Sequence, residues 1–190
     1  MAMNPHLENL QRGDCLLVLI DIQKVLLDPC VDAAGLRKNA AALLKVARVF
    51  DLPVLFTVHN ADKLGGALPE LVERAPAAQV LDKLEFSSLE NAAIAEAVRR
   101  SGRRTLLLTG IESHVCVFHT GVHALRLGYQ VHVAADAVSS RSAVNRQIGL
   151  NRLGKAGAVI SSTEMMTYEL LQRAGTAEFR TLLPLLKTLQ

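Results

Sequence analysis

The stretch Cys15-Leu-Leu-Val-Leu-Ile-Asp21 combines an apolar run of strand length with a carboxylate directly after it. Strands that are apolar at every position, rather than at alternate ones, are typical of parallel sheets covered on both faces. The same character recurs along the chain in short runs at residues 54–58, 79–81, 104–109, 131–135 and 158–161. We therefore expect about six strands in one mainly parallel sheet.

Longer stretches with apolar residues at helical spacing separate these runs, at residues 36–47, 89–98, 116–127, 144–153 and 165–171. Gly128, Gly157 and Gly175 stand where the C-terminal caps of helices are expected. Strands that alternate with helices predict an α/β fold with three layers, α/β/α, because crossover connections place helices on both faces of the sheet. No shift in composition and no internal repeat divides the chain, so residues 1–190 are expected to form a single domain.

The composition excludes several classes of protein. Half of the 190 residues are hydrophobic (50%) and 21% are charged, which argues against disorder. Lys and Arg (21) exceed Asp and Glu (18) by three without a dense basic block, so no nucleic-acid partner is expected. No apolar run approaches the roughly 20 residues of a membrane span, so no membrane partner is expected. Residues 1–14 lack the apolar core of a signal peptide. Three cysteines without zinc-type spacing fit reduced thiols in a cytoplasm.

Asp21, Lys83 and Cys116 follow predicted strands. Ligands in such folds bind beyond the carboxyl ends of the strands, so these three residues are candidates for a functional site. Asp21 is either a helix cap or a general base. Cys116 is either a buried small hydrophobe or a nucleophile at a helix N-terminus, where the helix dipole favours the thiolate. Lys83, taken alone, fits a surface lysine. A base and a cation beside a thiol are nevertheless what activates a cysteine nucleophile.

Several further polar residues invite a functional interpretation. His119 and His123 lie four residues apart, a spacing that can hold zinc, but the glutamate of a metalloprotease motif is missing. We favour packing or surface positions for both histidines. His114, two residues before the cysteine, is expected to line a pocket. Asp136 and Arg141 are expected to organise the loop after the fifth strand rather than to take part in catalysis.

Read in order, five segments resemble the isochorismatase-like, or cysteine hydrolase, superfamily, which also holds nicotinamidases and N-carbamoylsarcosine amidases. The resemblance covers nearly the whole chain, and the tail at residues 169–179 is similar to the isochorismatase domain-containing branch. It implies a Rossmann-like α/β domain. The segments are Leu17-Val-Leu-Ile-Asp-Ile-Gln23, Lys83-Leu-Glu-Phe-Ser87, Gly110-Ile-Glu-Ser-His-Val-Cys116, Gly128-Tyr-Gln-Val-His-Val-Ala-Ala-Asp-Ala-Val-Ser-Ser-Arg141 and Glu164-Met-Met-Thr-Tyr-Glu169.

The resemblance implies a catalytic triad of Asp21, Lys83 and Cys116. In this family the aspartate takes the thiol proton, the lysine stabilises the thiolate, and the cysteine attacks a carbonyl carbon. Water then cleaves the thioester-type intermediate. The resemblance also implies an oxyanion hole made by the backbone N–H groups of Glu112 and Cys116, with a non-proline cis peptide bond between Ile111 and Glu112.

Departures from the family pattern narrow the expected chemistry. Nicotinamidases carry an Asp-x-His pair that binds a metal, whereas this chain reads Val58-His-Asn-Ala-Asp-Lys63. No metal and no cofactor are therefore expected. Some isochorismatases lack the cysteine and act on a vinyl ether, so Cys116 favours acyl or amide chemistry. The residues expected to contact substrate, by adjacency alone, are Ile22, Gln23, His59, Phe86 and His114.

The leading hypothesis is a metal-independent hydrolase that acts on a small amide, ureide or related molecule. One alternative is a nicotinamidase-type, metal-assisted amidase. Another is a catalytically silent family member that serves as a scaffold, and a third is a redox-sensing thiol that Cys15 or Cys30 approaches. A homo-oligomer is also expected, because relatives are commonly oligomers. The apolar stripe at residues 182–189 packs either on its own domain or on a neighbour.

Overall fold

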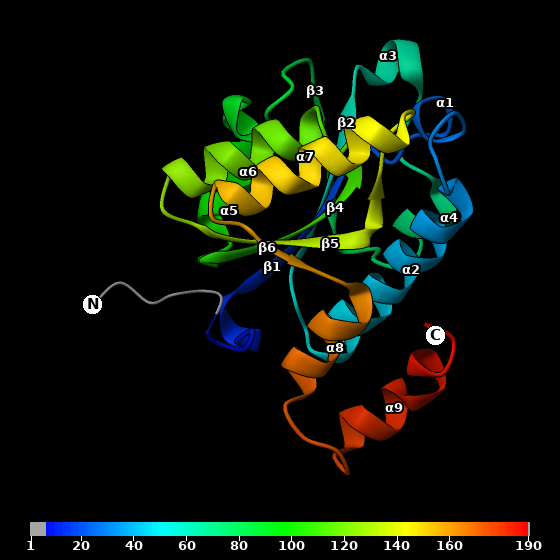
Figure 1. Ribbon diagram of the computed structural model, residues 1–190, viewed down its shortest axis with the longest axis vertical. Coiled ribbons are helices and arrows are strands. Elements are labelled where there is room, and N and C mark those ends of the chain that lie inside the picture. Colours follow the sequence, from blue (N-terminus) through cyan, green and yellow to red (C-terminus); the bar gives the residue numbers. More distant parts are fainter. Residues whose placement is uncertain (1–6, 190) are drawn as a thin grey trace.

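The computed structural model describes residues 7–189, so residues 1–6, where no signal peptide is expected, lie outside the described part of the chain. Within residues 7–189, six parallel strands form one sheet in the order β3-β2-β1-β4-β5-β6 (Figure 1). The α/β class and the parallel sheet are thereby confirmed. The strands are β1 (Cys15–Ile20), β2 (Val54–His59), β3 (Gln79–Lys83), β4 (Thr105–Ile111), β5 (Gln130–Ser139) and β6 (Val159–Ser161).

Helices cover both faces of the sheet, as Figure 1 shows. One face carries α2 (Ala33–Val49), α8 (Thr163–Leu171) and α9 (Ala177–Leu186), and the other carries α5 (Ala92–Arg100), α6 (Cys116–Arg126) and α7 (Ala143–Lys155). Short helical turns fill the connections: η1 (Arg12–Asp14), α1 (Lys24–Leu27), α3 (Ala61–Leu64), α4 (Pro69–Val72) and η2 (Ser88–Glu90).

The central strands are buried on both sides, which explains their apolar sequences. All residues of β1 and β4 are buried. Side chains alternate between the two faces, as the period of two in a strand requires. Thus Leu17 and Leu19 join the core under α2, whereas Val18 and Ile20 join the core under α6. The edge strand β3 is largely exposed, which is why its sequence is less apolar than that of β1.

The order of the strands reverses between β1 and β4. The chain runs outward from β1 to β2 and β3, then crosses back to place β4 on the other side of β1. In open α/β sheets this reversal of strand order marks the ligand site, at the carboxyl ends of the strands. Asp21 directly follows β1, Lys83 ends β3, and Cys116 begins the helix after β4. The fold therefore directs all three residues to one edge.

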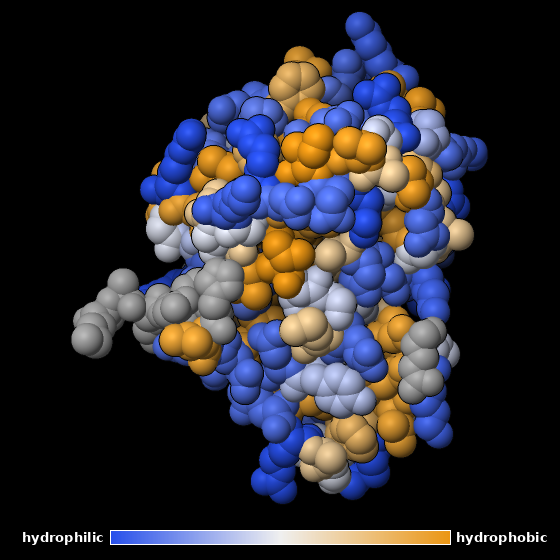
Figure 2. Space-filling model, viewed as in Figure 1, coloured by the Kyte–Doolittle hydropathy of each residue, from blue (hydrophilic) through white to orange (hydrophobic). Residues whose placement is uncertain are grey.

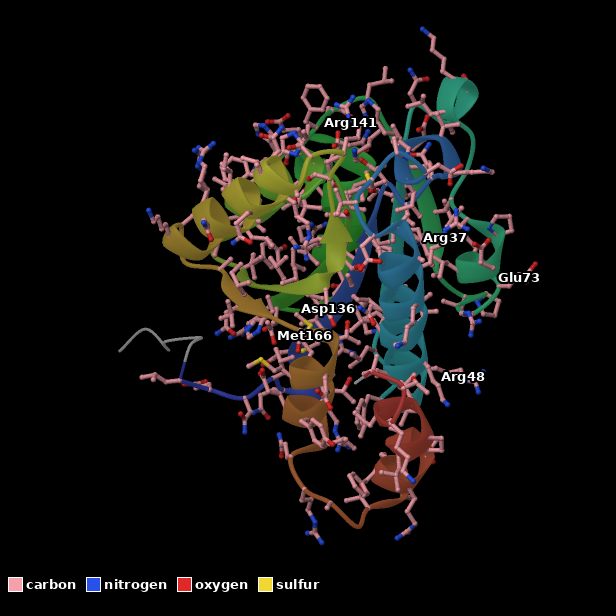
Figure 3. The ribbon with its side chains drawn as sticks, turned by 45° about the vertical axis from the view of Figure 1, so that its right-hand side comes forward. Arg37, Arg48, Glu73, Asp136, Arg141 and Met166 are labelled. Atoms are coloured by element: carbon pink, nitrogen blue, oxygen red, sulfur yellow. The ribbon has the colours of Figure 1, made fainter. Side chains whose placement is uncertain are left out.

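The fifth strand is longer than the sequence predicts. Its pairing with β4 shifts register between Leu108 and Gly110, and the strand then continues to Ser139. Asp136 consequently lies inside β5 and not in the loop after it, so that expectation is wrong. Its Oδ1 accepts hydrogen bonds from the N–H and the hydroxyl of Thr163 at the start of α8, and Figure 3 shows it beside this helix.

The C-terminal apolar stripe packs on its own chain. Leu182 and Leu186 of α9 are buried in the core that α2 and α8 share. Apolar atoms are instead exposed over α7 and near β6 (Figure 2), and these elements expose Val144, Ile148 and Ile160. The expected homo-oligomer therefore gains no support from the stripe. No helix within residues 7–189 is long and apolar enough to cross a membrane.

Candidate active site

Asp21 lies at the point where β1 ends, with its side chain 1% exposed. Its φ of 54° is in the left-handed region, which aspartate tolerates better than most residues. Oδ1 accepts a hydrogen bond of 2.8 Å from Thr57 Oγ1, and Oδ2 accepts one of 2.6 Å from Lys83 Nζ. A buried carboxylate needs such partners to offset its lost hydration. Thr57 was not anticipated, although it is the only polar residue in the run 54–58.

Lys83 is also buried, so the surface position that its sequence alone suggests is wrong. Its side chain is fully buried, and its ammonium donates to Asp21 and, at 3.1 Å, to the carbonyl of Glu85. Fully buried lysines almost always have an anionic partner. Lys83 and Asp21 therefore form a buried ion pair at the carboxyl ends of β1 and β3.

Two backbone features bring Cys116 to the same place. Gly110 has a φ of 124°, and a Cβ atom there would lie 2.0 Å from the carbonyl oxygen of Ile20. Only glycine lets β4 approach β1 so closely, directly before Asp21. The peptide bond between Ile111 and Glu112 is cis. The chain then turns into α6, whose first residue is Cys116.

The thiol of Cys116 is held in its protonated form. Burial raises its pKa most, the carboxylate of Asp21 raises it further, and Lys83 opposes both, so that the pKa reaches about 12. Its sulfur lies within hydrogen-bond reach of both Asp21 and Lys83. The thiol is therefore protonated near neutral pH, although it lies at the N-terminus of α6. Attack by this sulfur requires a base that removes its proton, and Asp21 is in position to do so.

His59 completes the group around the thiol. A ring nitrogen of His59, a carboxylate oxygen of Asp21 and Sγ of Cys116 all lie within 4.8 Å of one another. Gln23 fixes the backbone of His59, because its amide oxygen accepts from the His59 N–H at 2.6 Å and its amide nitrogen donates to the His59 carbonyl at 3.0 Å. The imidazole stacks on Phe86, with ring centroids 5.9 Å apart.

The residues expected to contact substrate lie in different surroundings. His59 lies at the thiol, and Phe86, which is 55% exposed, stacks on the ring of His59. Gln23 and Ile22 are buried, and the amide of Gln23 bonds only to backbone among the contacts described for residues 7–189. His114 Nδ1 lies 3.0 Å from the hydroxyl of Ser140. Their roles towards a substrate remain predictions.

The two histidines of α6 lie outside the group of Asp21, His59 and Cys116, which is the only set of three close metal-ligating side chains among residues 7–189. His123 Nδ1 lies 3.0 Å from the hydroxyl of Ser87, and His119 contacts the ring of Phe86. His119 is exposed and His123 is partly buried, so the expected surface or packing positions are observed.

A second polar pair lies next to the cis peptide bond. The backbone N–H of Arg141 donates to the carboxylate of Glu112 at 2.9 Å, and its Nε donates at 3.2 Å. Figure 3 shows Arg141 at the end of the sheet where the strands finish. Arg141 lies in the loop after β5, as expected, and this contact joins that loop to the carboxylate of Glu112.

The isochorismatase domain family matches residues 15–165 of this chain. The chain belongs to the isochorismatase family. It is 36% identical over 172 residues to isochorismatase domain-containing protein 2 of Rattus norvegicus, across 90% of this chain and 80% of the relative. The secreted isochorismatase effector Isc1 of Phytophthora sojae is 34% identical over 179 residues, across 90% and 83%. YcaC from Pseudomonas aeruginosa, solved with hexane-2,5-diol and covalent acrylamide, has a TM-score of 0.89 at 27% identity and 96% coverage of both chains.

These relatives confirm the resemblance found in the sequence, and they make the chain an isochorismatase-family hydrolase. The similarity extends over the whole sheet, from β1 to β6, and over both layers of helices. The strand ends that carry Asp21, Lys83 and Cys116 are thus part of the shared architecture.

Proposed function

We propose that the chain is a metal-independent cysteine hydrolase that acts on a small amide, ureide or related molecule. The observation that carries the proposal is the buried ion pair of Lys83 and Asp21 beside the thiol of Cys116. Burying two charges is unfavourable unless their geometry is good, and such a pair is weak evidence for stability alone. Next to a thiol the pair supplies the base and the cation that nucleophilic attack needs.

The proposed reaction has two halves. Asp21 takes the thiol proton as the sulfur bonds to the substrate carbonyl carbon, while Lys83 balances the negative charge. The backbone N–H groups of Cys116 and Glu112 stabilise the oxyanion, and the first N–H groups of a helix have no partner within it. Asp21 gives the proton to the departing amine as the carbon–nitrogen bond breaks. Water, deprotonated by Asp21, then cleaves the thioester and restores the thiol.

The alternatives make different demands on the same residues. A nicotinamidase-type mechanism needs a bound metal, so its activity is lost when a chelator removes the metal. Activity by the metal-independent mechanism proposed here persists in the chelator. A redox role needs a second reactive thiol. Burial raises the pKa of Cys15 to about 12 and that of Cys30 to about 11, and each of these thiols donates to a backbone carbonyl, whereas Cys116 has the carboxylate of Asp21 beside it. A silent scaffold has no use for a buried base beside a thiol.

Acrylamide is a suitable probe, because it is a small amide and because YcaC carries it covalently. The sulfur adds to the alkene carbon, and the thiol proton ends on the neighbouring carbon. Intact mass and peptide mapping give the rate of modification at each cysteine. Cys30 serves as the matched internal control, because Cys30 and Cys116 are both 7% exposed.

We expect acrylamide to modify Cys116 at least tenfold faster than Cys30, and Asp21→Asn to slow it about 100-fold, a usual value for loss of a general base. Equal rates at the two cysteines, or no effect of Asp21→Asn, would overturn the proposal. A screen of small amides and ureides for released ammonia or amine then identifies the substrate. Cys116→Ala must abolish that turnover.

Three further expectations, on domain organisation, assembly and location, belong to the same proposal. The chain forms a single domain over residues 1–190, assembles as a homo-oligomer, and resides in the cytoplasm with its three thiols reduced. The name of the relative Isc1 describes a secreted protein, so location is best measured directly by cell fractionation. Light scattering coupled to size exclusion gives the oligomeric state.

A further inference from the structure

We propose that Asp21, His59 and Cys116 form a site for one divalent metal ion of the zinc type, and that the bound ion blocks the thiol. The consequence for activity rests on the proposed function, whereas metal binding does not. The ion occupies the position from which the sulfur attacks, so metal binding and turnover exclude each other.

The donor atoms match the preference of zinc. Thiolate, imidazole and carboxylate are its usual ligands, at about 2.0–2.3 Å in a tetrahedral arrangement. Such bonds place the donors roughly 3.5 Å apart, and here the three atoms already lie within 4.8 Å of one another. Small rotations of the side chains bring the three donor atoms from their present separation to the separation of zinc ligands. Three protein ligands leave a fourth position for water.

His59 provides the observation that favours a metal. Its Nδ1 is buried and has no hydrogen-bond partner within residues 7–189. A buried polar atom without a partner is unfavourable, so each such atom in a folded protein calls for an explanation. The ring is already fixed in place by its stacking on Phe86 and by the contacts of Gln23 with its backbone.

The neighbours of Asp21 orient it as a ligand but limit the affinity. The hydroxyl of Thr57 donates to Oδ1 of Asp21, and a hydrogen bond of this kind positions a ligating carboxylate, whereas the ammonium of Lys83 competes with a metal ion for Oδ2. The ammonium of Lys83 repels a cation, although the carboxylate and a thiolate together outweigh its charge. We therefore expect reversible binding, weaker than in a structural zinc site.

Chelator-washed protein is titrated with Zn²⁺ and, separately, with Co²⁺. We expect one ion per chain, a near-ultraviolet charge-transfer band that reports a cobalt–thiolate bond, and protection of Cys116 against acrylamide that EDTA reverses. His59→Phe keeps a ring against Phe86 and removes the ligand nitrogen, so affinity should fall at least about tenfold. His119→Phe, which changes another histidine that contacts Phe86, should bind zinc as the wild type does.

Lys83→Met supplies an independent variant, because removal of the repelling ammonium should tighten zinc binding while it slows the reaction with acrylamide. Unchanged affinity in His59→Phe, no cobalt–thiolate band, or weaker binding in Lys83→Met would overturn the metal site. The proposed function fails on different grounds. If metal-free Cys116 reacts faster than Cys30 but no ion binds, the metal site alone is wrong. If zinc binds as expected but metal-free Cys116 is no faster than Cys30, the hydrolase mechanism alone is wrong.

Discussion

The buried pair of Lys83 and Asp21 makes a quantitative prediction about stability. Lys83→Met removes the ammonium that lies 2.6 Å from Asp21 Oδ2 and leaves a carboxylate that is 1% exposed. The hydroxyl of Thr57 still donates to this carboxylate, and the thiol of Cys116 remains within hydrogen-bond reach of it. Breaking one partner of a buried pair costs about 3–5 kcal/mol. We expect the free energy of unfolding to fall by about 3 kcal/mol, near the lower limit, because Thr57 still donates.

Urea unfolding at fixed protein concentration measures this change, read as a shift in midpoint with an unchanged slope. Asp21→Asn/Lys83→Met provides the key comparison, because it removes both charges and keeps similar side-chain volumes. Uncharged replacements of a buried pair are often neutral or stabilising, so this double variant should regain most of the lost stability. Lys24→Met, at an exposed ion pair with Asp28, should leave the midpoint unchanged.

Two results would refute this reasoning. A loss below about 1 kcal/mol in Lys83→Met would mean that Asp21 is not an uncompensated buried charge. The second result is a loss of stability in the double variant that equals the sum of the losses in the two single variants. It would mean that the residues act independently, because partners in contact show a coupling energy in a double-mutant cycle.

Further predictions concern the backbone around the site and the thiol. Gly110→Ala should prevent stable folding, because its Cβ would lie 2.0 Å from the Ile20 carbonyl oxygen; wild-type thermal stability would contradict this. Gln23→Ala removes three hydrogen bonds to backbone and should destabilise the protein by about 2–3 kcal/mol in urea unfolding. Because the pKa of the Cys116 thiol is raised to about 12, the thiolate fraction grows with pH. Iodoacetamide labelling of free Cys116 should therefore keep rising above about pH 9, and a plateau below that pH would show that burial does not control the thiol.

The sequence predicted those parts of the fold that local composition determines. The bounds of β1 agree with its apolar run, because each residue of this strand is buried. The end of β5 was missed, because its extension follows a register shift against β4 near Gly110. That irregularity depends on pairing between distant segments. Asp136 was misplaced for the same reason.

In the site, too, features that depend on local sequence could be predicted, whereas features that depend on contacts between distant segments could not. Strand ends could be located in the sequence, and Asp21, Lys83 and Cys116 were singled out for that reason. The protonated state of the thiol could not be predicted, because it depends on burial and on the carboxylate of Asp21, which only the folded chain brings to Cys116. The position of His59 against the thiol depends on Gln23, whose amide bonds to its backbone. No spacing in the sequence reports such a contact.

Under the proposed function, the charges of Asp21 and Lys83 serve the reaction rather than the fold. A fold needs only that buried groups be satisfied, and an uncharged pair of similar size meets that need. A thiol with a pKa of about 12, by contrast, needs a base within reach to become a nucleophile near neutral pH. The variant Asp21→Asn/Lys83→Met separates the two requirements. If it is as stable as the wild type while Cys116 no longer reacts with acrylamide, the ion pair exists for the reaction and not for the fold.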